Sequence, residues 1–472
     1  MEDSKKKHTA NNQKKKHQID AIEVTSDCLT SRAGLAPCVA YMNQIGIFTK
    51  LERYFGSLRK SKKGLPLAEL FKQVLCFMFD GTSRHVSHFD QLAADHGYGA
   101  AIETDPTQLA SSHQIKRMFG SFFLIHVLVF RRLLAQVFIR RLGETRPAVV
   151  ELGLDSMVMD NDDARCRNGV TPTYQKKKGF QPLQMNWGRL IIDAEFRPGK
   201  VHGNHGDTAR RMITDMVRRI RRHYRNDVPI IIRMDSGFFD QKIFELCEHL
   251  KIGYVCGGKM YYEVKAVACS APAGAWQQYT RHKNDEVGWE YLEFGTACKT
   301  WKRFRRALYC RFLANHRQLY LPDCRPDTVI VTNLSQGGYI DELLERAGMA
   351  DYTSTHSLVA LYHGRGSDEL NDRALKDFGH EQLPFKQFTA NAAWYYMMVL
   401  GYNLLECYKY DVAYDVVPTG AYATTIRRRL IDIAGKIVRH AHKTVLKVSA
   451  ACAAQLNLAE LLHRCRQVQA LP

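Results

Sequence analysis

The sequence predicts an α/β protein with a mixed β-sheet core, a β-rich insertion in that core, and helical regions before and after it. The core is predicted from apolar, strand-like runs that alternate with amphipathic helices over 147–257 and again over 328–380. The insertion is predicted over 258–327, where the helical period lapses and aromatic residues mix with lysine and arginine. Apolar residues recur at intervals of three and four over 36–142 and over much of 381–472, which predicts the two helical regions.

Composition limits the partners of such a protein. Lysine and arginine number 67 against 48 aspartates and glutamates, giving a formal net charge of +19. That excess predicts a polyanionic partner, because a protein that neutralises phosphates releases their counterions. Charge alone does not say which polyanion. Residues 1–20 form a lysine-rich tail that is expected to be disordered and to serve either as a non-specific DNA tether or only as a solubilising segment.

No signal for export or membrane insertion is present in the sequence. Its start has no apolar segment of the secretory type, and its longest apolar runs, 122–130 and 394–405, are too short to span a bilayer. Its 13 cysteines include no Cys-x-x-Cys pair, which favours reduced thiols over disulfides or a structural zinc site. A cytoplasmic protein is therefore expected.

The helical region 36–142 is predicted to bind DNA. Its last segment, 112–142, is expected to be one continuous helix capped by Ser111 or Ser112. Short helices with outward-facing basic side chains would bind a DNA end in the manner of a helix-turn-helix domain, although no clear helix-turn-helix signature is present. The basic side chains expected to face outward are Lys116, Arg117, Arg131, Arg132, Arg140 and Arg141.

The core region predicts strands and helices in a definite order. Strands are expected at 148–159 and 186–196, followed by a turn that leads to a third strand. Asp207 then opens a helix. A buried strand over 228–238, a helix and a further strand at 252–258 complete a mixed sheet.

Two aspartates stand at the ends of predicted strands. Asp155 and Asp235 each end an apolar run and precede a serine. If the two strands are neighbours, the carboxylates converge at the mouth of the sheet, where they could hold Mg²⁺ ions that activate a hydroxyl and stabilise a leaving oxygen. Glu369, on a helix crossing that edge, is the candidate third acid. The alternatives are ordinary ones: a strand-end Asp can form a turn or cap a helix, and a helical Glu can simply be exposed.

A spaced set of residues lies in the stretch LYHGRGSDELNDRALKDFG, 361–379. It follows the pattern Tyr-x2-Arg-x3-Glu-x6-Lys and consists of Tyr362, Arg365, Glu369 and Lys376. Together with DSGF at Asp235 and LDSMVM around Asp155, this set resembles the DDE transposases of bacterial insertion sequences that carry the YREK signature. Met157 stands where many of those proteins have threonine. The resemblance covers roughly residues 105–450.

The resemblance implies a ribonuclease H-like core with three metal-binding catalytic acids, Asp155, Asp235 and Glu369. Two Mg²⁺ ions, for which Mn²⁺ would substitute, are the implied cofactors. Arg365 and Lys376 would contact phosphates beside the scissile bond, and Tyr362 would bind a phosphate oxygen or stack on a base. Plain alternatives exist, since Arg365 could pair with a neighbouring acid and Tyr362 could simply pack. The remaining acids of this stretch are expected to be solvated: Asp368, Asp372 and Asp377.

Further positions are predicted to contact DNA. Lys176, Lys177 and Lys178 lie between the first two core strands, where they would bind the DNA backbone or simply form a solvated hairpin tip. Trp301 and Arg303 belong to the insertion, whose mixture of aromatic and cationic residues suits distorted or single-stranded DNA.

The function implied by the resemblance is transposition. The protein would bind the terminal inverted repeats of its own element, cut phosphodiesters with Mg²⁺-activated water and use the freed 3′-hydroxyl to attack target DNA. Because two DNA ends must be cut together, a homodimer on double-stranded DNA is expected, at the nucleoid of a bacterial cytoplasm. Two alternatives stay open: a metal-dependent nuclease without strand transfer, and a catalytically silent DNA-binding repressor of transposition.

Overall fold

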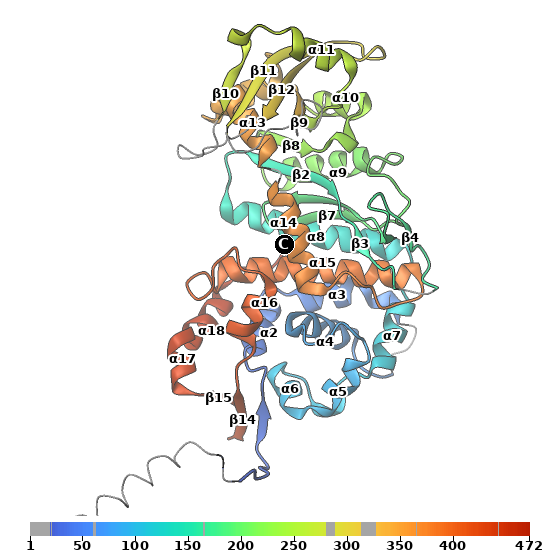
Figure 1. The fold of residues 1–472 in the computed structure, drawn as a ribbon. Coiled ribbons are helices and arrows are strands. Elements are labelled where there is room, and N and C mark those ends of the chain that lie inside the picture. Colours follow the sequence, from blue (N-terminus) through green and yellow to red (C-terminus); the bar gives the residue numbers. More distant parts are fainter. Residues whose placement is uncertain are drawn as a thin grey trace, which may run out of the picture.

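One mixed sheet forms the centre of the computed structural model (Figure 1). The structure describes residues 19, 21–59, 63–163, 166–279, 288–312, 327–364, 366–441 and 443–472. In order across the sheet, its strands are β10 (Gln277–Tyr279), β11 (Trp289–Thr296), β12 (Arg305–Phe312), β13 (Thr328–Thr332), β9 (Gly253–Gly257), β8 (Ile230–Met234), β2 (Val150–Ser156), β6 (Leu183–Trp187) and β7 (Leu190–Glu195). The tail 1–20 lies outside the described residues, apart from Ile19.

The middle of the sheet is parallel. β2 pairs with β8, and β8 with β9, in parallel register, whereas the other neighbouring strands are antiparallel. Ile230, Ile231 and Ile232 of β8 are each at most 1% exposed. Strands buried on both faces need apolar residues at successive positions, which explains the continuous apolar runs in the sequence. The predicted α/β class with a mixed sheet is confirmed.

The segment predicted as one strand at 186–196 is two strands. β6 and β7 form a hairpin whose turn contains Gly188, at a φ of +55° in the left-handed region that favours glycine. The third strand predicted after 197–204 is absent among the described residues, and the chain passes instead through turns to α9 (Thr208–His223). The prediction was wrong here because apolar residues continue on both sides of Gly188 and hide the turn.

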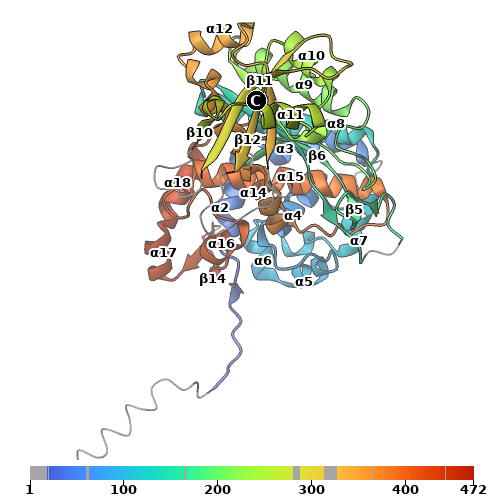
Figure 2. The ribbon, with the colours of Figure 1, turned by 45° about the horizontal axis from the view of Figure 1, so that its top comes forward.

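The insertion extends the central sheet. Its strands β10, β11 and β12 pair in antiparallel register, and β12 joins the core through β13. Figure 2 brings these strands to the front of the molecule. The segment also contains a helix that the sequence did not predict, α11 (Tyr262–Ser270). Residues 280–287 and 313–326 lie outside the described ranges.

The predicted continuous helix 112–142 is two helices. Ser111 caps α7 (Ser112–Gly120) through a capping box with Gln114, as predicted for the start of the segment. The chain then bends by 102° into α8 (Ile125–Thr145). Apolar residues continue through the bend, so periodicity alone did not reveal it. The preceding helices are α2 (Leu35–Gln44), α3 (Ile47–Phe55), α4 (Leu67–Asp80), α5 (His88–Ala94) and α6 (His96–Ala101).

Three arginines of α8 do not face outward as predicted. Arg131 Nε donates to Asp193 Oδ1 of β7 at 2.7 Å. Arg140 and Arg141 both pair with Asp411, at the end of α15 (Phe388–Asp411). These carboxylates bind guanidinium groups that were predicted to contact DNA, and the ion pairs hold α8 against the sheet and α15.

Helix α15 joins the three predicted regions in one core. Its residues from Ala390 to Lys409 are all buried, and it packs against α4, α7, α8 and β7. Figure 1 shows it between the sheet and helices α2 to α6. The helical regions 36–142 and 381–472 therefore share a hydrophobic core with the sheet.

The ends of the described chain meet in a second sheet. β1 (Cys28–Thr30) pairs with β14 (Gly435–His440), which pairs with β15 (Lys443–Val448). Basic and apolar residues alternate over much of 435–448, as is typical of strands with one exposed face. The other C-terminal helices are α16 (Ala423–Ile426), α17 (Ala450–Leu456) and α18 (Leu458–Gln467).

Candidate active site

Asp155 and Asp235 lie side by side at the carboxyl ends of β2 and β8. In the parallel register Leu154 pairs with Met234, so the next residue of each strand occupies a neighbouring position, roughly 5 Å away across the sheet. Both aspartates are half-buried. The condition stated from the sequence, that the two strands are neighbours, is met.

Local hydrogen bonds orient both carboxylates. Asp155 Oδ1 accepts from the backbone N–H of Ser156 at 2.7 Å, and Asp235 Oδ1 accepts from that of Gly237 at 2.8 Å. Asp235 thereby caps a short 3₁₀ turn, Ser236–Phe238. A Cβ at Gly237 would lie 2.9 Å from Asp235 Oδ1, so a side chain there would crowd the carboxylate. Capping and a catalytic role are compatible for Asp235, because the turn fixes where its carboxylate stands.

Tyr362 reaches the same edge from α13 (Thr355–His363). The register of β8 and β9 makes Gly257 the neighbour of Asp235. A Cβ at Gly257 would lie 2.6 Å from Tyr362 Oη, closer than real side chains approach. Glycine at this position therefore makes room for the tyrosine hydroxyl beside Asp235.

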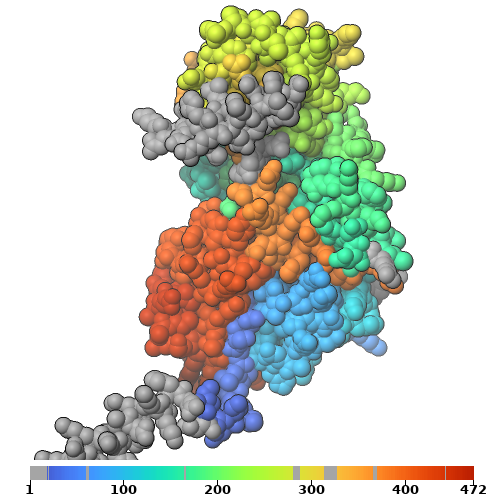
Figure 3. Space-filling model, in the orientation of Figure 1, coloured from blue at the N-terminus to red at the C-terminus, as the bar shows by residue number. Residues whose placement is uncertain are grey.

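The YREK-like residues are divided between two helices. Tyr362 ends α13, whereas Glu369 and Lys376 belong to α14 (Gly366–Gly379). Arg365 stands between the helices and lies outside the described residues. Glu369 is exposed near the start of α14. In Figure 3 the orange surface of this part of the chain is exposed between a teal-green surface and the red surface of the C-terminal part.

Lys376 lies seven residues after Glu369, close to two helical turns. Its ammonium group pairs with Glu381 at 2.7 Å. The pKa of Asp160 is lowered, mainly by a hydrogen bond from Lys177 and to a smaller extent by the charge of Lys376. A phosphate would therefore have to compete with these acids for Lys376.

A hairpin next to the first core strand carries Tyr174, whose hydroxyl is influenced by the charges of the two aspartates. It is formed by β4 (Thr171–Pro172) and β5 (Lys178–Phe180), and β5 also pairs with β3 (Met159–Asp160). Loss of hydration and the charges of Asp155, Asp372 and Asp235 raise the pKa of Tyr174 at the hairpin tip. The Tyr174 hydroxyl is thus within electrostatic reach of three carboxylates. From the sequence, only the lysines of this hairpin were predicted to contact DNA, and Tyr174 was not recognised as a candidate.

Two acids of α14 are not solvated as expected. Asp377 accepts hydrogen bonds from the backbone N–H and the hydroxyl of Thr424 at 2.9 and 2.6 Å, which ties α14 to α16. Asp372 is half-buried, and its charge acts on Tyr174 together with those of the two strand-end aspartates. Asp372 follows Glu369 by three residues, so both lie on one side of the helix. In the sequence of a charged helix, acids that are half-buried in the fold cannot be distinguished from exposed ones.

The predicted DNA-binding lysines are exposed. Lys176, Lys177 and Lys178 surround the hairpin tip, and Lys177 Nζ pairs with Asp160 at 2.7 Å. Lys116 and Arg117 are exposed on α7. The structure is compatible with DNA contact by these side chains, and their role stays a prediction.

Trp301 has packing partners within the protein. Its ring lies 5.2 Å from that of Phe239 and 5.7 Å from that of Phe244, and the buried Arg305 guanidinium lies 4.9 Å from its centroid. Arg303 is 3.6 Å from Glu248. A stacking role on DNA would require Trp301 to leave these contacts, so the contacts favour a structural role for this side chain.

The residue types at this edge suit a divalent cation. Mg²⁺ prefers oxygen ligands, and the two strand-end aspartates provide carboxylates at adjacent positions. Among the described residues, no group of three or more His, Cys, Asp or Glu side chains is close enough to hold a metal ion. Two acids are therefore in place, and Glu369 does not yet join them in this arrangement.

Comparison with known proteins assigns the family. The model for the transposase DDE domain group 1 matches residues 12–470. The chain belongs to this family of DDE transposases. It is accordingly an enzyme of phosphoryl transfer on DNA, and DNA binding and transposition follow from the same match.

A solved structure is similar to this DDE transposase over most of its length. It is the cryo-EM structure of the piggyBac transposase synaptic complex with hairpin DNA, at 11% sequence identity and a TM-score of 0.42, covering 86% of this chain and 83% of that chain. No curated protein matches the sequence. Within the described ranges, no single helix is long and apolar enough to cross a membrane. The twelve cysteines in those ranges are all free thiols.

Proposed function

We propose that this transposase belongs to an insertion sequence, binds the terminal inverted repeats of its element, and cuts and joins DNA with Asp155, Asp235 and Glu369 as its catalytic acids. The observation that carries the proposal is the register of β2 and β8, which brings the first two acids to adjacent positions at one sheet edge. The spacing of Tyr362, Glu369 and Lys376 supports it from the sequence.

The arrangement of strands supports a ribonuclease H-like core for this function. β2 pairs on one side with the antiparallel hairpin of β6 and β7, and on the other with the parallel strands β8 and β9. The carboxyl ends of the parallel strands face one edge, where ligands of open α/β sheets usually bind. A DNA phosphate at that edge would meet both aspartates.

Asp155 and Asp235 would hold Mg²⁺, or Mn²⁺ in its place, and Glu369 would complete the ligands of two ions. When bound, such ions activate an attacking oxygen and stabilise the leaving oxygen of a phosphodiester. Tyr362 would donate its hydroxyl to a phosphate oxygen beside Asp235. Arg365 and Lys376 would neutralise the flanking phosphates. Cleavage and strand transfer are both phosphoryl transfers, so one edge serves both steps.

The exposure of Glu369 sets a condition on the proposal. Since Glu369 is not grouped with the two aspartates, the first turn of α14 must approach the sheet edge when DNA and metal bind. A homodimer on double-stranded DNA would allow two element ends to be processed together.

The proposal is tested by incubating the protein with Mg²⁺, target plasmid and a labelled duplex that carries the repeats flanking its gene. Metal-dependent release of 3′-hydroxyl ends followed by a joined product is expected. Cleavage without joining would favour a nuclease. Binding without cleavage would favour a silent repressor.

The third acid is tested with two variants of one helix. Glu369→Gln is expected to abolish cleavage while leaving DNA binding intact, because a neutral amide oxygen neutralises no charge of the metal ions and holds them more weakly than a carboxylate does. Asp372→Asn is the matched variant three residues further along. Normal cleavage by Glu369→Gln, combined with loss of cleavage by Asp372→Asn, would move the role of third acid to Asp372.

A further inference from the structure

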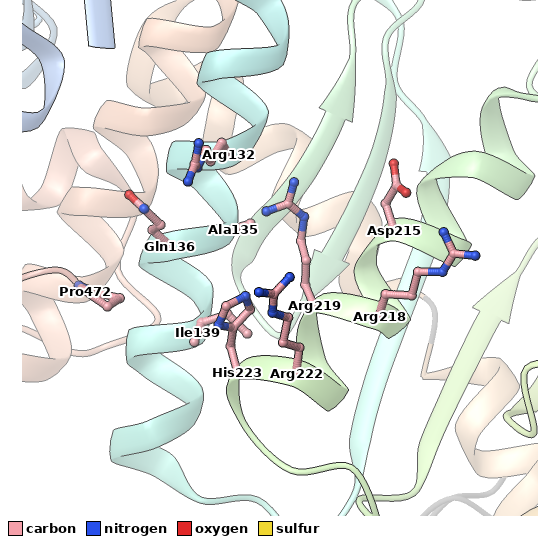
Figure 4. A pocket seen from close by; sticks show the side chains of 10 residues that line it. All are labelled: Arg132, Ala135, Gln136, Ile139, Asp215, Arg218, Arg219, Arg222, His223 and Pro472. Atoms are coloured by element: carbon pink, nitrogen blue, oxygen red, sulfur yellow. The ribbon is translucent and has the colours of Figure 1, made fainter. Parts of the chain in front are cut away.

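A cavity of about 770 Å³ between α8 and α9 is lined by arginines (Figure 4). We call it the arginine pocket and define it by four residues: Arg132 of α8 with Arg218, Arg219 and Arg222 of α9. The sequence predicted DNA contact for Arg132, whereas the family match and the sequence motifs assign no role to the three arginines of α9. One side-chain carboxylate, that of Asp215, lines the same cavity.

Helical periodicity explains why the arginines gather there. α9 buries Met212, Ile213, Met216, Val217 and Ile220 on the face toward the core. Its arginines at 218, 219 and 222 repeat at intervals of one, three and four on the opposite side, and Figure 4 shows Arg219 and Arg222 extending toward the space beside α8. α8 lines that space with residues 132, 135, 136 and 139, again at intervals of three and four.

Several other arginines on or beside α9 have partners within the protein. Near the two ends of α9, Arg210 and Arg225 pair with the acids Asp207 and Asp227. Arg221 donates to the backbone oxygen of Leu250 at 2.6 Å.

Within the part of the chain that the structure describes, by contrast, no ion pair or hydrogen bond engages the side chains of Arg218, Arg219 or Arg222. Arg132 lies over the ring of Tyr54, with its guanidinium carbon 5.7 Å from the centroid. The four arginines outnumber the Asp215 carboxylate that lines the same cavity, so their like charges repel one another, and a polyanion relieves that repulsion.

Phosphate is the anion that best fits these side chains. Guanidinium groups bind phosphate oxygens through paired N–H donors. Residues 218 to 222 span about 6 Å of helix, over which one strand of a duplex presents about two phosphates. Three arginines in this span can therefore contact neighbouring phosphates of one duplex.

The pocket is separated from the candidate active site. α9 ends at His223 and β8 begins at Ile230, so the arginines lie toward the start of β8, whereas Asp235 follows its end. The strand between them is roughly 16 Å long. A phosphate in the pocket is thus not the phosphate at the catalytic edge.

We propose that the arginine pocket is a second DNA-backbone site, which binds duplex DNA away from the scissile phosphate and without reading its sequence. The inference rests on the proposed function only in taking DNA as the polyanion. It gives the transposase a contact with flanking or target duplex that is independent of the catalytic acids.

The test compares two triple variants of the full-length chain that lose the same charge. The pocket variant is Arg218→Gln, Arg219→Gln, Arg222→Gln. The control changes three exposed cations that each pair with an acid, and it is Arg225→Gln, Arg346→Gln, Lys436→Gln. Binding of a fluorescent duplex of unrelated sequence is measured by anisotropy over a range of NaCl concentrations. For the pocket variant, the slope of log affinity against log salt should become shallower by about 2 to 3, one counterion per lost phosphate contact.

The control should change the slope by less than about 1, because its cations already bind carboxylates. Equal slopes for the two triple variants would overturn the inference. Circular dichroism checks that both are folded. Cleavage by the pocket variant at saturating DNA should match wild type, and loss of that rate would show that the arginines serve the active site rather than a separate one. The salt dependence can be measured even if the protein proves not to cut DNA, so failure of the proposed function and failure of this inference give different results.

Discussion

Arg427 holds the carboxyl-terminal ends of two helices together, and its removal should destabilise the protein strongly. Its guanidinium donates to the backbone oxygens of Met78 and Phe79 at 2.8 and 3.0 Å, at the end of α4. It also donates to those of Asp377 and Phe378 at 3.0 and 2.6 Å, near the end of α14. A cation at this point complements the negative ends of both helix dipoles. The helix that carries Glu369 is therefore anchored by this residue.

The expected magnitude follows from the number of bonds. Arg427→Met keeps the apolar stem and removes the partners of four backbone carbonyls. At about 1 kcal/mol for each of the four bonds, with some relief from water and relaxed helix ends, the free energy of unfolding should fall by about 2–4 kcal/mol. Urea denaturation followed by circular dichroism measures this change.

A neighbour supplies the control. Arg428 is exposed, and Arg428→Met should change the free energy of unfolding by no more than about 0.5 kcal/mol. A loss of less than about 1 kcal/mol for Arg427→Met would refute the reasoning, since it would mean that the four carbonyls find other partners.

Two further predictions concern the insertion. Trp301→Ala should lower the free energy of unfolding by about 2–4 kcal/mol, because the ring packs on Phe244 and Arg305. Unchanged stability combined with weaker binding of single-stranded DNA would instead show that Trp301 contacts DNA. Hydrogen bonds from Arg306 hold the pKa of Glu293 below its ordinary value. The pair therefore stabilises the folded state fully at a pH above the unfolded-state pKa of about 4.3. This stabilisation is lost as the pH falls through the lower pKa of the folded state. The difference in Tm between wild type and Glu293→Gln should therefore shrink in acid, and a constant difference from neutral pH into that acid range would contradict this account.

The elements predicted best from the sequence are those whose burial requires a recognisable run of apolar residues. β8 was recognisable because both faces of a central parallel strand are covered, which demands an apolar run. Asp155 and Asp235 could be singled out because each ends such a run. Their adjacency depended on strand pairing, which is not a local property, and it could only be stated as a condition.

The errors arose where distant residues decide the outcome. Arg131 and Arg140 look like exposed cations in the sequence, but their partners lie 62 and 271 residues away. Asp372 looks like any acid of a solvated helix, yet the fold brings its charge close to Tyr174 of another hairpin. The bend between α7 and α8 was hidden because an apolar segment keeps its pattern whether or not the helix is continuous.

Strand β1, the first that the structure describes, can pair only after β14 has been synthesised. Thr30 pairs with Gly435, and Gly34 lies against the backbone of Leu430 with no space for a side chain. At about 5–20 residues per second, a ribosome needs about 20–80 s to make the chain between these partners. During that time the N-terminal helices lack both this strand pairing and α15, on which their apolar faces pack. A nascent chain that already contains Asp155, Asp235 and Glu369 is thus still unable to close its core until residues 430–437 have been made.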